Sequence, residues 1–164
     1  MPPPTRLRPT WTTCCERNIS VKRYLLLTIA VVAAACSGGD ALSLEDPWAR
    51  PSPTGATTAA FFMTIDNPTD TDETLVSAAT DACRVTELHL SAMVDGVMSM
   101  QRQENGIPVP ASETVTLAPG GLHIMCIDRI ADFAEGEELD ITLEFVDANG
   151  DSHTEELTAV VEDR

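Results

Sequence analysis

Apolar and polar residues alternate over short runs from Leu44 onward, and turn-forming segments rich in Gly, Pro, Asn or Asp separate the runs at intervals of about ten residues. In 139–147 the apolar residues occupy every second position, which places them on one face of a strand. The segment "DANGD" that follows is a hairpin signal. No sustained helical period is present. The pattern predicts eight strands, at 58–66, 74–79, 83–90, 97–102, 113–117, 121–127, 139–147 and 153–162.

This strand spacing is typical of a β-sandwich or barrel, and it predicts one all-β domain. The segments between the strands, among them "QENGIPVP" at 103–110, are expected to be turns and loops. We assign 44–164 to this domain and 36–43, which contains "SGGD", to a flexible tether.

The N-terminal part of the chain has a different character. Residues 22–36, "KRYLLLTIAVVAAAC", combine a positively charged start, an apolar run of 12 residues and small residues before Cys36. The run is too short to span a bilayer comfortably. Small residues directly before a cysteine resemble a bacterial lipobox, whose cysteine becomes lipidated. We therefore expect 1–35 to be an N-terminal extension plus signal peptide, and the exported protein to be anchored at the extracytoplasmic face of the membrane, in the periplasm, through a lipid on Cys36.

The charge changes once 1–35 are set aside. Five arginines, no lysine and 25 of the 26 acidic residues remain, which gives a net charge of about −20. Such a surface repels nucleic acid, so no nucleic-acid partner is expected. The acidic residues form either a solvated shell suited to a salty habitat or a docking face, and the charge alone does not choose between the two.

Three cysteines follow residue 35. If Cys36 is lipidated, Cys83 and Cys126 remain as a pair, and an oxidising compartment favours a disulfide between them. Simple strand alternation places Cys83 on the face of His89 and Cys126 on the opposite face, so a disulfide would need a bulge. The alternative is a free Cys126 that acts as a redox-sensitive metal ligand.

Four of the five methionines after residue 35 lie in two stretches, "HLSAMVDGVMSM" at 89–100 and "HIM" at 123–125. On the second stretch, alternation places His123 and Met125 on the face away from the core. By the same argument His89 points away from the core, and Met98 and Met100 share a face. The imidazoles and thioethers are therefore expected on a common surface. Met93 is expected just past a strand end, as a packing residue or part of an apolar lip.

Thioether sulfur is a poor ligand for zinc and for hard ions but a good one for Cu(I), and imidazole binds both copper states. The set of His and Met residues therefore predicts a Cu(I) site, with Met98 as a candidate accessory ligand. A blue-copper electron carrier is a weaker alternative, because Cys126 has no histidine a few residues downstream. His153 is assigned to the surface, with a weak Cu(II) site as its alternative.

Catalytic motifs of the G-x-S-x-G, H-E-x-x-H, C-x-x-C and phosphate-loop types do not occur in the chain, so we do not expect an enzyme. A rival hypothesis is an exported Ig-like interaction or adhesion module in which the His and Met residues are incidental.

These residues resemble the periplasmic copper chaperones of the PCuAC type, which are linked to copper supply for cytochrome c oxidase. The signature of that family is a His, ten residues, a Met, about twenty-one residues and His-x-Met, whereas the second gap here has 22 residues. Flanking text such as "DPWARPSPTGATTAAFFMTIDNP" and "IPVPASETVTLAPGGLHIM" is similar to the family as well. The resemblance covers about 44–162.

The resemblance implies that His89, Met100, His123 and Met125 bind Cu(I). It implies a cupredoxin-like Greek-key β-sandwich with the site near one end. It also implies delivery of copper to an acceptor, either the copper centre of cytochrome c oxidase or another copper chaperone. Two departures stand out. The longer second gap is expected to enlarge the "QENGIPVP" loop, and cysteines at 83 and 126 are unusual for the family.

Overall fold

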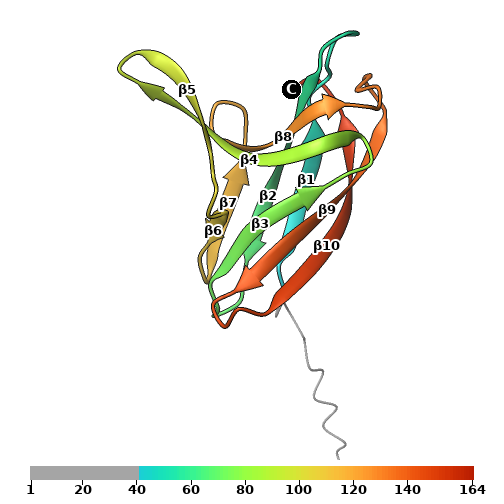
Figure 1. Cartoon of the computed structure of the whole chain (residues 1–164). Helices are drawn as coiled ribbons and strands as arrows, with labels where there is room; N and C mark the ends of the chain where they lie inside the picture. The colour runs from blue at the N-terminus through green and yellow to red at the C-terminus, as the bar shows by residue number, and fades with distance from the viewer. Residues whose placement is uncertain (1–40) are drawn as a thin grey trace, which may run out of the picture. The chain divides into compact units, whose positions relative to one another are not determined.

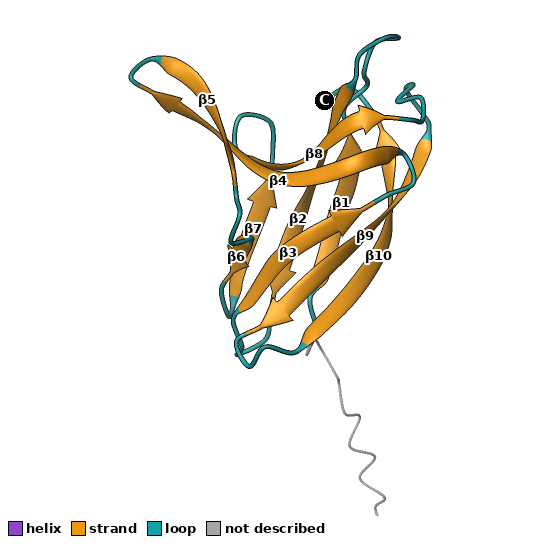
Figure 2. Ribbon diagram, viewed as in Figure 1, coloured by secondary structure: helices purple, strands orange, loops and turns teal. Residues whose placement is uncertain are grey.

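The computed structural model describes residues 41–164, and in that part the chain forms strands and no helix (Figures 1 and 2). No helix long and apolar enough to cross a membrane is therefore found among these residues. The segment expected to be a signal peptide and the proposed lipidation site Cys36 lie outside the described residues. The strands are β1 (Ser43–Ala49), β2 (Thr58–Asn67), β3 (Glu73–Ala79), β4 (Cys83–Val94), β5 (Val97–Arg102), β6 (Ile107–Val109), β7 (Glu113–Leu117), β8 (Leu122–Arg129), β9 (Glu138–Asp147) and β10 (Ser152–Val161).

All eight predicted strands are present, and two further strands, β1 and β6, were not predicted. β1 lacks a regular alternation because its pairing with β2 shifts between Glu45 and Trp48, where Asp46 has a φ of 52°. β6 is only three residues long and contains Pro108, which is why 103–110 was expected to be a loop throughout. That expectation is wrong for the second half of the segment, where β6 pairs with β3.

The strands form one mixed sheet in the order β5-β4-β8-β2-β1-β10-β9-β3-β6, with β7 paired to β2. The β1–β10 pair is parallel, and the other pairs are antiparallel. The open sheet folds around a core as a cupredoxin-like single domain, as predicted. Figure 1 shows β4 and β8 crossing one end of the body and the β4–β5 hairpin projecting away from it.

The core lies between the strands of this folded sheet. The predicted alternation in β9 is confirmed, since Leu139, Ile141, Leu143 and Phe145 are all buried. Phe61 and Phe133 meet edge to face in the same core, with ring centroids 5.5 Å apart. Each fully buried apolar side chain of this size contributes about 1.5–3 kcal/mol. The core therefore supplies a rigid base for the end of the molecule where β4 and β8 cross.

Cys83 of β4 and Cys126 of β8 form a disulfide, with their Cα atoms 5.6 Å apart. Both side chains are buried, so the expectation from simple alternation that Cys83 lies on the His89 face is wrong. The reason is a break in alternation, because Cys83 is buried whereas Val85, two residues on, is 48% exposed. Asp128, on the facing strand, has a φ of 53° at the same place. This local irregularity turns Cys83 into the core.

Candidate metal centre

The register of β4 against β8 places His89 directly opposite His123. The two imidazole rings lie 5.8 Å apart between centroids and are inclined by 72°. Their neighbours in sequence, Leu88 and Ile124, also oppose each other and point into the core. Alternation therefore holds on both strands here, and it puts both histidines on the face that turns away from the core.

Two methionines are placed on the same face by the pairing of strands. Met125 lies two residues beyond His123 on β8. Met100 of β5 lies opposite Ser91, which is two residues beyond His89 on β4. Because residues two apart on a strand share a face, and directly opposed residues do as well, all four predicted ligands share one face of three adjacent strands.

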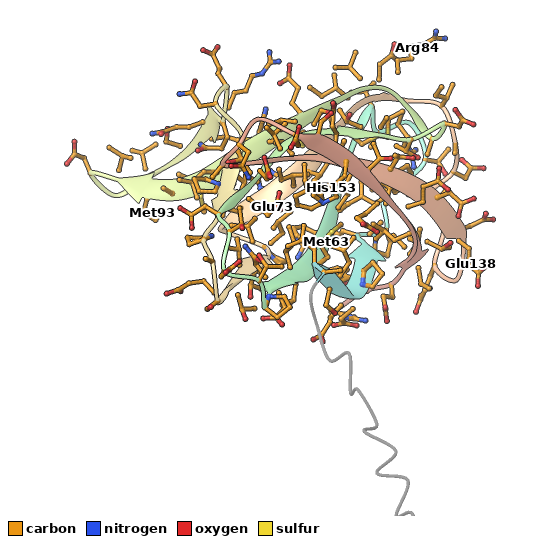
Figure 3. The ribbon with its side chains drawn as sticks, turned by 90° about the horizontal axis from the view of Figure 1, so that it is seen from below. Met63, Glu73, Arg84, Met93, Glu138 and His153 are labelled. Carbon is orange, nitrogen blue, oxygen red and sulfur yellow. A yellow bond between two sulfur atoms is a disulfide. The ribbon has the colours of Figure 1, made fainter. Side chains whose placement is uncertain are left out.

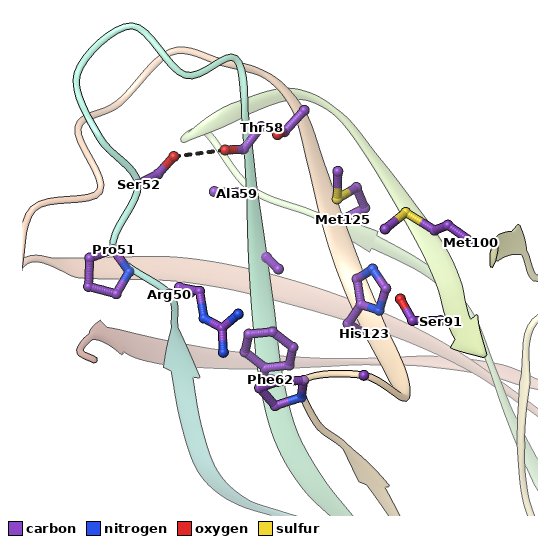
Figure 4. Close-up of a pocket in the computed structure, with 13 residues that line it drawn as sticks. Arg50, Pro51, Ser52, Thr58, Ala59, Phe62, Ser91, Met100, His123 and Met125 are labelled. Atoms are coloured by element: carbon purple, nitrogen blue, oxygen red, sulfur yellow. Dashed lines mark hydrogen bonds between the residues drawn. The ribbon is translucent and has the colours of Figure 1, made fainter. Parts of the chain in front are cut away.

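A pocket of about 250 Å³ opens on this face and is lined by Met100, His123 and Met125, with Ser91 and Phe62 beside them. Figure 4 shows the sulfur atoms of Met100 and Met125 and the ring of His123 turned toward one another at one side of the pocket. His89 does not line the pocket and lies next to it. The opposite side of the pocket is formed by Arg50, Pro51 and Ser52, which precede β2.

His123 is buried, with only 5% of its surface exposed. Its Nδ1 lies 3.0 Å from the carbonyl oxygen of Gly121. A carbonyl only accepts, so Nδ1–H donates and the lone pair of Nε2 is left available. Burial lowers the pKa of His123, the Gly121 hydrogen bond opposes this change, and the charge of a protonated His89 adds to it. The ring is therefore held in the neutral form that binds metals.

His89 is held by a carboxylate that the sequence analysis did not single out. Its Nε2 lies 2.9 Å from Oε2 of Glu87, and Oε1 of Glu87 lies 3.0 Å from a guanidinium nitrogen of Arg102. In the neutral ring Nε2–H donates to Glu87 and Nδ1 carries the lone pair. That Nδ1 is buried and has no hydrogen-bond partner among residues 41–164. An unpaired buried acceptor next to His123 suits a metal ligand.

Glu87 was within reach of sequence reasoning. It lies two residues before His89 on the same strand, so alternation already places both side chains on one face. Carboxylates near metal-binding histidines commonly fix the ring tautomer. The signal was hidden because the chain has 26 acidic residues, most of which have no special neighbour.

The methionines differ in their surroundings. Met63 is buried in the core, whereas Met100 and Met98 are 52% and 59% exposed. Met93 was expected just past a strand end, as a packing residue or part of an apolar lip, and the position and the packing role are wrong. It lies within β4, which continues to Val94, and it is 64% exposed opposite Met98.

Two alternatives from the sequence are overturned. Cys126 is bonded to Cys83 and fully buried, so it offers no thiolate for a blue-copper centre and no redox-sensitive extra ligand. His153, which was assigned to the surface, is half-buried, and its ring stacks on Phe145 with centroids 5.5 Å apart. Its alternative role in a weak Cu(II) site stays a prediction. Across residues 41–164, no group of three or more His, Cys, Asp or Glu side chains is arranged to hold a metal. Beside the His89–His123 pair, the pocket holds the thioethers of Met100 and Met125.

Comparison with known proteins places the fold in a class. The chain is similar to the solved copper-bound PCuAC domain from PmoF2, with 26% identity, a TM-score of 0.59, and coverage of 75% of this chain and 93% of that domain. It is similar to the solution structure of CuI-DR1885 from Deinococcus radiodurans, with 28% identity, a TM-score of 0.59, and coverage of 79% of this chain and 85% of that one. The protein has the fold of a PCuAC-type domain.

The family assignment is more specific. Residues 42–156 match the family described as "Putative lipoprotein LpqE-like", and the chain belongs to this family. It is also 30% identical over 110 residues to "Putative lipoprotein Lxx21020" of Leifsonia xyli subsp. xyli. That match covers 67% of this chain and 65% of the Leifsonia protein, so the chain spans slightly less than two thirds of that relative's length.

Proposed function

We propose that the protein is an exported copper chaperone that binds one Cu(I) ion through His89, Met100, His123 and Met125. The observation that carries the proposal is the meeting of two imidazoles and two thioethers on one face of β5, β4 and β8. This set of neutral donors selects a soft monovalent ion and needs no thiol. The names of the similar PCuAC structures, which include bound copper and Cu(I), support the choice of metal.

The arrangement suits delivery of the ion better than its storage. His123 and the unpaired Nδ1 of His89 are buried and held by neighbours, whereas Met100 is half exposed on the projecting hairpin. An incoming thioether, imidazole or thiolate of an acceptor can add to the ion while Met100 leaves. No bond of a substrate is made or broken, and copper keeps its oxidation state throughout. Cu(II) is a secondary cargo that the two imidazoles also suit.

The acceptor we propose is the copper centre of cytochrome c oxidase or another copper chaperone that serves it. The location we propose is the extracytoplasmic face of the membrane, reached by a lipid on Cys36. The lipoprotein names of the family and of the Leifsonia relative support the anchor.

A Cu(I) competition titration against a chromogenic chelator tests the site. Met100→Leu and His123→Ala should each weaken Cu(I) binding, because each removes one donor and leaves the fold's core intact. His153→Ala is the matched control, since it removes a histidine of β10, which is not one of the three adjacent strands that carry the proposed ligands. Unchanged affinity in both ligand variants would sink the assignment, and no Cu(I) binding by the unaltered protein would favour the interaction-module hypothesis.

A further inference from the structure

The β4–β5 hairpin carries methionines that the four-ligand site does not use. Met93 and Met98 lie directly opposite each other near its tip, and Met100 follows Met98 on the same face of β5. The other two methionines within 41–164 are Met125, which lies on β8 at the pocket, and Met63, which lies in the core. Figure 3 shows Met93 out on the hairpin and Met63 within the body. A line of thioethers therefore runs from the hairpin tip to the pocket.

Packing does not account for Met93 and Met98, which are 64% and 59% exposed. Side chains this exposed bury little apolar surface and so contribute little to stability. Packing alone would therefore allow polar residues at both positions. The hairpin itself needs no methionine, because its two-residue turn at Asp95 and Gly96 has the positive φ values of 51° and 81° that such turns require.

The geometry of the pair fits one soft ion. Side chains directly opposite each other in an antiparallel pair have Cβ atoms about 4.5–5.5 Å apart. The unbranched methionine side chain has three rotatable bonds, which allows two facing sulfurs to close on a common ion. The strand segments 91–94 and 97–100 that carry the pair hold no charged residue, and Asp95 in the turn is the one ionised group between them. Hard cations therefore find few ligands there.

We propose that Met93 and Met98 form a second, weaker Cu(I) site that shares Met100 with the main site and passes the ion to and from it. This inference rests on the proposed function of the main site. An ion held by Met93 and Met98 first gains the sulfur of Met100. His123 Nε2 and Met125 then replace the two outer sulfurs. Thioethers carry no proton, so the transfer releases none, and copper stays as Cu(I).

The second site is weaker because it has no imidazole and stands in water. It therefore fills after the main site at equilibrium, although an arriving ion meets it first. Its position at the most exposed end of the hairpin also makes it the part of the site that an acceptor reaches first.

Methyl-labelled methionine allows the order of filling to be observed by NMR during titration of the protein with Cu(I), and with Ag(I) as a redox-inert stand-in. The first equivalent should shift the methyl signals of Met100 and Met125. The second equivalent should shift those of Met93 and Met98. The double variant Met93→Leu/Met98→Leu should lose the second equivalent and keep the first, because leucine preserves the apolar surface and removes only the sulfurs.

The matched control is Val94→Leu/Val97→Leu, which changes the directly opposed pair on the other face of the same hairpin and should keep both equivalents. Stopped-flow transfer of Cu(I) to a chelator should be slower in the methionine double variant and unchanged in the valine one. A methionine double variant that still takes a second equivalent, or that transfers copper at the original rate, overturns the relay. If Met100→Leu and His123→Ala both still bind the first equivalent as the unaltered protein does, the proposed function of the main site is overturned instead.

Discussion

The carboxylate of Glu87 contacts both His89 and Arg102, and both contacts affect the proposed copper site. One carboxylate oxygen accepts from His89 and the other from Arg102, which lies opposite His89 on β5. The carboxylate thus ties the β5 strand to the ring of a proposed ligand and selects the Nε2–H tautomer of that ring. Its role is to position His89, since its own oxygens are already engaged.

Glu87→Ala should weaken Cu(I) binding by about 10–100-fold, because outer partners of metal-binding histidines have effects of this size. Glu87→Gln keeps an acceptor oxygen and should lose less. Competition titration measures the affinity, and long-range ¹H–¹⁵N NMR spectra of the ring nitrogens report the tautomer of His89. A ring that stays fully in the Nε2–H form in Glu87→Ala would contradict the positioning role.

A second residue of interest is Glu73, at the start of β3, which carries a buried carboxylate oxygen. It is nine-tenths buried, and its Oε2 has no hydrogen-bond partner in the described part of the chain. Burial is the main cause that raises the pKa of Glu73 above its ordinary value of 4.5, nearby His153 opposes the rise, and Asp147 adds to it. The folded state thus binds this proton more tightly than the unfolded state does. Stability is therefore lost as pH rises from 4.5 through the raised pKa.

Glu73→Gln should raise the free energy of unfolding at pH 7 by about 1 kcal/mol, because it removes a buried charge that lacks a partner. The gain should vanish near pH 4, where the native carboxyl is protonated. Urea denaturation at both pH values measures the difference. Equal gains at the two pH values would show that the benefit is unrelated to ionisation.

The disulfide acts at the scale of the strands, because it joins β4 and β8, the two strands that carry both histidines. It closes a loop with a sequence separation of 43. Cys83→Ala/Cys126→Ala should lower the free energy of unfolding by about 4 kcal/mol, the chain-entropy value for such a loop. Urea denaturation of the variant and of the reduced protein should give similar losses. A loss confined to the variant would point to the buried sulfur atoms rather than to the cross-link.

The strands that the sequence predicted are those whose neighbours in the fold require a regular alternation of buried and exposed side chains. β9 is an example, because every second residue meets the core. The same rule placed the two histidines and Met125 correctly relative to Ile124. It failed at Cys83, where one irregular step of β4 reverses the faces, and at β1, where Asp46 and Pro47 interrupt the strand. Such breaks depend on how neighbouring strands cross each other. The pattern of apolar and polar residues along a single strand does not contain that information. Glu87 was missed for a different reason, since alternation places it on the face of His89 but does not distinguish it from the other acidic residues of the chain.

At the scale of the whole molecule, the main electrostatic feature is the excess of acidic over basic side chains. Three of the five arginines in the described residues pair with carboxylates: Arg84 with Asp128, Arg102 with Glu87, and Arg164 with Asp46 and Glu162. Most acidic side chains therefore have no cationic partner, and their mutual repulsion opposes the compact state.

Added NaCl should raise the melting temperature, because the Debye length falls from about 30 Å at 0.01 M to about 10 Å at 0.1 M and the repulsion is screened. Calorimetry over this range measures the effect, and most of the rise should come at the low-salt end. Sucrose at matched osmolality is the control, since it carries no charge. A melting temperature that is flat or falls with salt would show that repulsion is not the controlling factor.

The two spacings between the proposed ligands tolerate change very differently. The ten residues between His89 and Met100 run around a tight hairpin, so one inserted residue would turn Met100 to the other face of β5. The 22 residues between Met100 and His123 pass through β6 and β7, and His123 is placed by its pairing with β4 rather than by the length of this connection. The extra residue in the second gap therefore carries little consequence for copper. The turns of that connection can gain residues without moving His123, whereas a single insertion in the hairpin would take a proposed ligand off the face.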